Sequence, residues 1–181
     1  MNKIYIIENF VDQKDLSTIL KFLNTTEVTF DPTGYSPFGV YMENKDNANL
    51  KEVFKKNSLK AKTIIENSFN CKVYDEGMTS IVELKAGDFM PLHFDHGSSE
   101  NKSVGLKTGA GNPTRDLSSV LYYNDDYEGG EICFPNQDLI IKPKPGMFIC
   151  FPASDDFPHQ VTTIIKGYRW CSTAFWCVKK D

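Results

Sequence analysis

The chain has three histidines, and two of them are in settings that could bind a metal ion. His93 and Asp95 form a His-x-Asp segment. On an extended segment, residues two apart project to the same face, so these two side chains can offer a nitrogen and an oxygen to one point. If the strand that begins at His159 lies beside this segment, two imidazoles and one carboxylate would meet at one metal. That ligand set is typical of non-haem Fe(II) sites, which keep further coordination positions open.

Arg169, on the strand that follows His159, adds a second chemical feature. A guanidinium buried inside a β-barrel is unfavourable unless it meets an anion. A dicarboxylate that chelates a metal at one end would present its other carboxylate to such an arginine, where bidentate pairing is strong. For Arg169 to face the same interior as His159, the connecting loop needs an odd number of residues. A connection over residues 164–168 would set Thr163 opposite Arg169.

The N-terminal part of the chain, over residues 1–70, is predicted to be mainly helical. Residues 3–7 predict a short strand, and Asp12 then offers an N-cap for an amphipathic helix that ends near residue 24. Residues 31–46 read as a loop because they are rich in Gly, Pro, Asp and Asn. A second helical stretch runs from about residue 47 to residue 69, with Asn57-Ser58 as a candidate break.

Beyond residue 70 the pattern changes to short strands separated by Gly and Pro. Residues 97–116 are too long for a tight connection, and loops of that length usually carry function. Many short strands of this kind predict a sandwich or barrel. We therefore expect an α+β fold in one domain of residues 1–181, with helical support over 1–70 packed outside a β-core of about 79–178. The strands expected in the core cover residues 79–84, 117–123, 131–135, 139–142, 147–151, 159–165 and 169–178.

Composition excludes several classes of protein. The 181 residues carry a formal net charge of −4, which argues against a nucleic-acid binder. No apolar run is long enough to span a membrane, and the apolar stretch at the N-terminus is too short for a signal peptide. The five cysteines form no Cys-x-x-Cys pair, so a thiolate zinc site is not expected. This cysteine usage suits a reducing compartment, and we expect a cytoplasmic protein.

Taken in order, the motifs of residues 79–178 resemble those of the 2-oxoglutarate- and Fe(II)-dependent dioxygenases, specifically the prolyl 4-hydroxylase-like branch. A His-x-Asp pair alone is a weak signal, whereas the order and spacing of the whole set are specific. The residues that carry the resemblance are His93-x-Asp95, the run Val120-Leu121-Tyr122-Tyr123-Asn124-Asp125, Gly129-Gly130-Glu131, Cys133-Phe134-Pro135, Pro143-x-Pro145-Gly146, and His159 with Arg169.

The resemblance implies a double-stranded β-helix, or jelly roll, that holds Fe(II). Enzymes of this family split 2-oxoglutarate to succinate and CO₂ with O₂ and hydroxylate a C–H bond, and ascorbate is a candidate additional cofactor. By resemblance, His93, Asp95 and His159 are the iron ligands, Arg169 binds the far carboxylate of 2-oxoglutarate, and Tyr122 helps to hold the same cosubstrate. Halogenating relatives have Gly or Ala where this chain has Asp95, so the implied product is hydroxylated.

Several alternatives stay open at this point. The substrate implied first is a prolyl or related residue of a peptide or protein. The same chemistry on a free amino acid, a small metabolite or a nucleobase is the second hypothesis, and a non-catalytic cupin-like metal-binding module is the third. Tyr122 could be a core aromatic residue, and we read His96 as a supporting or loop residue. Substrate choice is expected to lie in the loops over 31–46 and 97–116.

Overall fold

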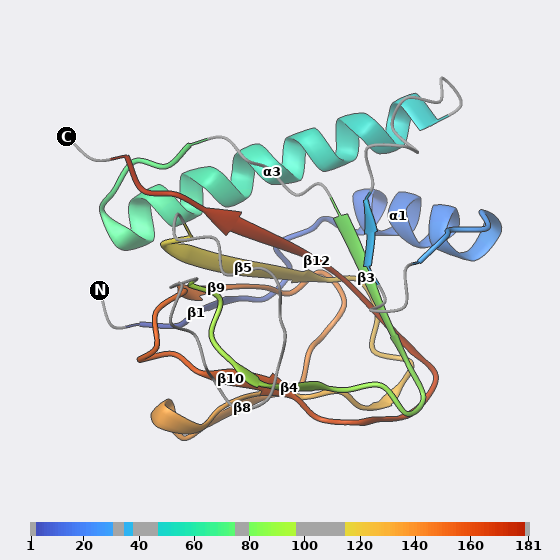
Figure 1. Cartoon of the computed structure of the whole chain (residues 1–181). Coiled ribbons are helices and arrows are strands. Elements are labelled where there is room, and N and C mark those ends of the chain that lie inside the picture. Colours follow the sequence, from blue (N-terminus) through green and yellow to red (C-terminus); the bar gives the residue numbers. More distant parts are fainter. Residues whose placement is uncertain (1–2, 31–34, 38–46, 75–79, 97–114, 180–181) are drawn as a thin grey trace.

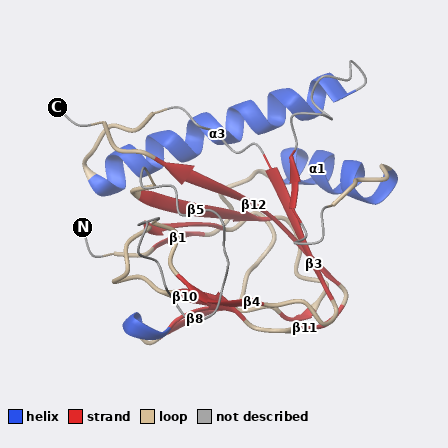
Figure 2. Ribbon diagram, viewed as in Figure 1, coloured by secondary structure: helices blue, strands red, loops and turns tan. Residues whose placement is uncertain are grey.

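In the computed structural model, antiparallel sheets form most of the molecule and two long α-helices cover one of them (Figure 1). The structure describes residues 3–30, 35–37, 47–74, 80–96 and 115–179. The mixture of helices and sheets agrees with the α+β prediction (Figure 2). The helices and strands, in chain order, are β1 Tyr5–Ile7, α1 Gln13–Thr25, β2 Tyr35–Pro37, α3 Ala48–Phe69, β3 Ser80–Lys85, β4 Met90–His93, β5 Leu117–Tyr122, β6 Glu128–Gly129, β7 Ile132–Phe134, the 3₁₀ helix Pro135–Gln137, β8 Leu139–Ile141, β9 Phe148–Pro152, β10 His159–Val161, β11 Ile164–Lys166 and β12 Tyr168–Trp176.

The strands form three sheets, and the two larger ones enclose the core that matters for function. The large sheet has six strands in the order β1-β9-β5-β12-β3-β2, and the small sheet has four in the order β4-β10-β7-β8. Strands β11 and β6 form a separate pair. Figure 1 shows the small sheet below the large one, with α1 and α3 above.

Two apolar clusters follow from the alternation of side chains along the strands of the large sheet. On β12, Ala174 and Trp176 belong to the cluster beneath the helices, whereas Cys171 belongs to the cluster between the sheets. On β5, Leu121 faces the helices and Tyr122 faces the small sheet. Because successive residues of a strand point to opposite faces, one sheet supports both cores.

The helices agree with the sequence prediction at their ends but not in the middle of α3. The Asp12 side chain caps α1 by accepting a hydrogen bond from the amide of Asp15 at 2.8 Å, as predicted. The break expected at Asn57-Ser58 is wrong, because α3 is continuous. Asn57 is buried, and its amide donates to Val53 O and to the Asp15 carboxylate. This residue therefore joins the two helices. None of the helices in the described ranges is long and apolar enough to cross a membrane.

Two strand predictions are corrected by the structure. The segment expected to be one strand over 159–165 is two strands, β10 and β11, which belong to different sheets. Strand β10 pairs with β4 and β7, whereas β12 pairs with β3 and β5, so Arg169 lies opposite Leu84 and not Thr163. The predicted loop over 31–46 contains β2, and its remaining residues, like 97–114, lie outside the described residues.

The pairing of β6 with β11 depends on close backbone approach at Gly129. A Cβ atom there would lie 2.1 Å from the carbonyl oxygen of Thr163, and the residue has a φ of +78°. We expect Gly129→Ala to lower the free energy of unfolding by more than the ~1–3 kcal/mol typical of backbone strain alone. Gly87→Ala is the matched control, because Gly87 has a φ of +96° with no described heavy atom within 4 Å of an added Cβ. Urea denaturation of both variants measures the difference, and equal losses would contradict the importance of this contact.

Candidate active site

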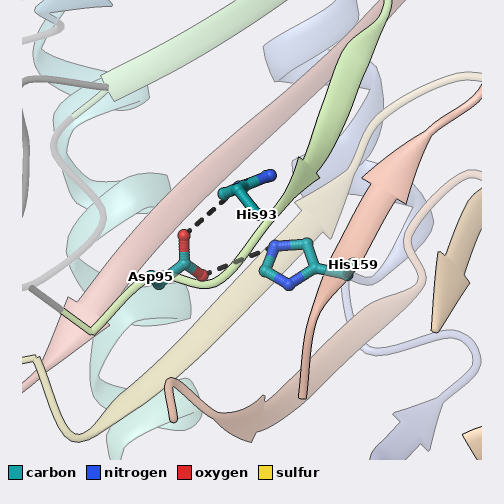
Figure 3. A group of neighbouring side chains, drawn as sticks. All are labelled: His93, Asp95 and His159. Carbon is teal, nitrogen blue, oxygen red and sulfur yellow. Dashed lines mark ion pairs between the residues drawn. The ribbon is translucent and has the colours of Figure 1, made fainter. Parts of the chain in front are cut away.

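Three of the predicted site residues converge where β4 and β10 pair. Strand β4 ends at His93, which lies directly opposite His159 at the start of β10. Asp95 follows β4 in a bend, and its two oxygens lie 3.5 Å from His93 Nε2 and 3.6 Å from His159 Nε2 (Figure 3). Among the described residues, this is the one group of His, Cys, Asp or Glu whose ligand atoms could hold a metal ion, with all of them within 4.8 Å of one another.

Backbone carbonyls fix the orientation of both imidazoles. His93 Nδ1 lies 2.8 Å from Pro91 O, and His159 Nδ1 lies 3.1 Å from Phe157 O. A carbonyl oxygen can only accept, so each Nδ1 carries the hydrogen and each neutral ring keeps the lone pair of Nε2 for a metal. The His159 ring also packs edge-on against Phe151, with 4.8 Å between the ring centroids. Each ring is therefore held with Nε2 toward the carboxylate.

Asp95 and His159 have the protonation states that bind a metal ion, whereas at His93 burial acts to lower the pKa but the hydrogen bond and charge of Asp95 raise it. Burial acts to raise the pKa of the Asp95 carboxyl, but His159 and His93 outweigh it and lower this pKa to about 2. Burial lowers the pKa of His159. At neutral pH Asp95 therefore offers a carboxylate and His159 an uncharged imidazole, and a metal ion would displace the proton that the raised pKa favours on His93. Two imidazoles and one carboxylate fit Fe(II) and leave room for further ligands.

Arg169 is buried in β12, where no carboxylate of the described residues lies within ion-pair distance of it. Its Nη1 donates to Cys171 Sγ at 3.4 Å, and its guanidinium carbon lies 4.9 Å from the centre of the Tyr122 ring. Among the described residues no carboxylate forms an ion pair with it, and Arg169 Nε has no hydrogen-bond partner. The hydroxyls of Tyr122 and Tyr127 are buried and unpartnered as well. A buried guanidinium with unsatisfied donors around it fits an anion.

The candidate metal-binding group of His93, Asp95 and His159 faces the same interior as Arg169. Tyr122 and Cys171, which contact the guanidinium, belong to the cluster between the two sheets. Phe151, on which the His159 ring packs, belongs to the same cluster. The structure thus brings together the five residues that the sequence singled out, with the metal-binding group on or next to the small sheet and the cationic group on the large sheet.

Asn124 holds the backbone on both sides of Arg169. Its side-chain oxygen accepts from Trp170 N at 2.9 Å, and its side-chain nitrogen donates to Tyr168 O at 2.7 Å. These two residues flank Arg169, so the buried amide fixes the start of β12. Sequence reasoning did not assign this role to Asn124, nor any role to Tyr127 and Cys171. The signal for Asn124 was present in the Asn-Asp pair that precedes the double glycine.

His96 does not join the metal-binding group, in agreement with the prediction. Its Nδ1 donates to Arg115 O at 2.8 Å, and its backbone amide donates to Ala153 O at 2.8 Å. His96 and Arg115 stand at the two ends of the segment 97–114. Their hydrogen bond therefore joins the two ends of this segment next to Asp95.

Comparison with known proteins identifies a family for this region. A family model for the 2OG-Fe(II) oxygenase superfamily matches residues 79–177. Prolyl 3-hydroxylase 2 from Homo sapiens is 45% identical over 67 residues, which are 34% of this chain and 9% of that protein. Prolyl 3-hydroxylase 1 from Homo sapiens is 30% identical over 107 residues, covering 54% of this chain and 14% of that protein. The chain thus matches a small part of the length of these relatives.

Solved structures share the fold over nearly the whole chain. A viral collagen prolyl hydroxylase from Paramecium bursaria Chlorella virus-1 aligns with a TM-score of 0.71 and 18% identity over 98% of this chain and 90% of that one. A prolyl 4-hydroxylase from Pseudomonas putida aligns with a TM-score of 0.64 and 14% identity, covering 99% and 95% of the two chains. A prolyl hydroxylase from Trichoplax adhaerens, solved with a peptide fragment of the hypoxia inducible factor, gives a TM-score of 0.68 and 15% identity over 98% and 84%.

Proposed function

The chain belongs to the 2OG-Fe(II) oxygenase superfamily, and we propose that it hydroxylates a prolyl residue of a peptide or protein with release of succinate and CO₂. Membership makes it an oxidoreductase that uses Fe(II), 2-oxoglutarate and O₂. The observation that carries the proposal is the shared interior of two complementary groups. One is the His93, Asp95 and His159 cluster, and the other is the buried guanidinium of Arg169, which pairs with no carboxylate in the described ranges.

Each of these residues has a proposed role. His93, Asp95 and His159 would hold the iron through Nε2 and carboxylate oxygens, and Arg169 with Tyr122 would bind the far carboxylate of 2-oxoglutarate. With iron and cosubstrate bound, the site would use O₂ to split 2-oxoglutarate and add one oxygen atom to a substrate C–H bond. The chain's own part is to keep Asp95 ionised and both imidazoles correctly oriented.

The prolyl substrate is supported by the similar proteins. The sequence relatives are named prolyl 3-hydroxylases, and the structural ones include prolyl 4-hydroxylases. Because the sequence identity to the prolyl 3-hydroxylases is much higher, we propose carbon 3 of the proline ring as the first position to test. The structure of a relative with a bound peptide supports a peptide rather than a free amino acid as substrate.

We also propose a jelly-roll fold and a cytoplasmic setting. The two facing antiparallel sheets support a jelly-roll core, and we propose that residues 1–181 act as one catalytic domain with the helices as support. The five free cysteines are consistent with a reducing cytoplasmic setting.

A substrate screen scored by mass tests the proposed function. The protein is incubated with Fe(II), 2-oxoglutarate and a panel of proline-containing peptides under ¹⁸O₂, with and without ascorbate. We expect a gain of one ¹⁸O atom on a proline, with matching succinate release, and amino-acid analysis separates 3-hydroxyproline from 4-hydroxyproline. Oxygen gain on a free amino acid, small metabolite or nucleobase, with none on peptides, would contradict the prolyl assignment. Absence of succinate above a metal-free control would favour a non-catalytic metal-binding module.

A further inference from the structure

Tyr127 is a buried phenol to which neither the sequence nor the family motif gives a role. It lies between β5 and β6, it is 6% exposed, and it belongs to the same cluster between the sheets as Tyr122. Its hydroxyl is buried and has no hydrogen-bond partner among the described residues. A buried hydroxyl without a hydrogen-bond partner is unfavourable, because it has lost its hydrogen bonds to water. Such a group points to a ligand that would satisfy it.

Two glycines hold the Tyr127 ring next to Arg169. A Cβ atom added at Gly130 would lie 2.9 Å from Tyr127 Cε2 and 3.1 Å from Arg169 Cδ, so both side chains pack on this one residue. A Cβ atom at Gly167 would lie 3.1 Å from Tyr127 Cβ. Both glycines have a positive φ, +72° at Gly130 and +84° at Gly167, which favours glycine at each turn. The ring is therefore fixed between the turn after Tyr127 and the turn before Arg169.

Hydrogen-bond chemistry shows what is missing around these two side chains. Burial raises the pKa of Tyr127 to about 12, so the phenol keeps its proton at neutral pH. A guanidinium has only donors, so Arg169 can donate to the phenol oxygen but cannot accept the phenol hydrogen. The hydroxyl of Tyr127 and the free N–H of Arg169 therefore both need an acceptor. An anion at the guanidinium would satisfy both donors at once.

We propose that the Tyr127 hydroxyl donates a hydrogen bond to the carboxylate that Arg169 binds, as a further positioning residue for the dicarboxylate cosubstrate. This inference rests on the proposed function, because it takes 2-oxoglutarate to be the ligand of Arg169. The far carboxylate then meets Arg169 together with two phenols, Tyr122 and Tyr127. A monocarboxylic 2-oxo acid would leave all three without an acceptor, so the trio favours a diacid.

Isothermal titration of 2-oxoglutarate into the Mn(II)-loaded protein tests the role of Tyr127 without turnover. Mn(II) takes the same kinds of ligand as Fe(II). Tyr127→Phe keeps the ring between the two glycines and removes the hydroxyl, and we expect about a tenfold weaker affinity, as for a lost hydrogen bond to a charged group. Tyr123→Phe is the matched control, because that buried hydroxyl donates to Ser172 Oγ in the cluster beneath the helices. Its affinity for 2-oxoglutarate should match that of the unmodified protein.

Oxalate serves as a second probe, because it chelates a metal and has no far carboxylate. We expect Tyr127→Phe to bind oxalate as tightly as the unmodified protein does. Unchanged affinity for 2-oxoglutarate in Tyr127→Phe would overturn the inference, and so would an equal loss for oxalate, which would indicate a general disturbance of the site. Failure of the unmodified Mn(II) protein to bind 2-oxoglutarate would instead overturn the proposed function, so the two failures are distinguishable.

Discussion

Replacing His159 with alanine is expected to reduce hydroxylation by more than about 100-fold. Even the mutation of a residue that only supports a metal ligand typically lowers metal affinity or activity about 10–100-fold. The variant keeps His93 and Asp95 but loses one of the three donors that converge within 4.8 Å. Without the third donor, the carboxylate and the remaining imidazole hold a divalent ion weakly. Metal content after dialysis, measured by atomic absorption, should fall together with turnover.

The control for this variant comes from the same strand. Gln160 follows His159 on β10, and its side chain is exposed on the other face. Gln160→Ala should keep both metal content and turnover, and circular dichroism should show folded protein for both variants. Near-normal activity in His159→Ala would refute the assignment of the metal ligands. Loss of the fold in His159→Ala alone would be resolved with His159→Gln, which preserves most of the side-chain volume and should still lose metal.

The convergence of His93, Asp95 and His159 could be predicted from sequence because much of it is encoded locally. His93 and Asp95 are two residues apart, and His159 is one of three histidines in the chain, so few combinations were available. The expected extended segment is only slightly different in the structure, because β4 ends at His93 and Asp95 lies in the bend beyond it. The cap at Asp12 was predictable for the same reason, because a side chain three residues before the amide it binds is a local signal.

The position of Arg169 was predicted correctly for a reason that the structure corrects. The sequence argument joined its strand to that of His159 as neighbours and counted loop residues to choose the inward face. In the structure the two strands lie in opposite sheets, and Arg169 faces inward because β12 pairs with β3 and β5. Pairing between strands far apart in sequence decides that face, and no local pattern encodes it.

Tertiary contacts also explain the features that sequence reasoning missed. Asn57 has low helix propensity and looked like a break, but its side chain bonds to a buried Asp15 on the other helix. No sequence motif singled out Tyr127. The burial of its hydroxyl without a described hydrogen-bond partner depends on the fold, which packs Gly130 and Arg169 next to its ring.

Replacing Arg169 with methionine is expected to raise the KM for 2-oxoglutarate by at least about 100-fold. Removing one partner of a buried, hydrogen-bonded charge pair typically costs 2–5 kcal/mol, and the far carboxylate would lose its cationic partner. Metal content should stay unchanged, because in the described part of the chain Arg169 forms no hydrogen bond or ion pair with His93, Asp95 or His159 and donates instead to Cys171 Sγ. Steady-state kinetics with varied 2-oxoglutarate, together with metal analysis, separates the two effects.

Arg169→Met is expected to weaken 2-oxoglutarate binding but not to lower the melting temperature of the ligand-free protein. Arg169 is 3% exposed and has no carboxylate partner among the described residues, so its charge is buried without compensation when no cosubstrate is bound. An apolar side chain of similar length removes that charge, and such replacements are often neutral or stabilising. Without 2-oxoglutarate, Arg169→Met should therefore melt at the same temperature as the unmodified protein or higher. The stabilisation that 2-oxoglutarate gives the unmodified Mn(II) protein should be lost in the variant. A large drop in the melting temperature without ligand, combined with an unchanged KM, would mean that the guanidinium serves the core and binds no cosubstrate.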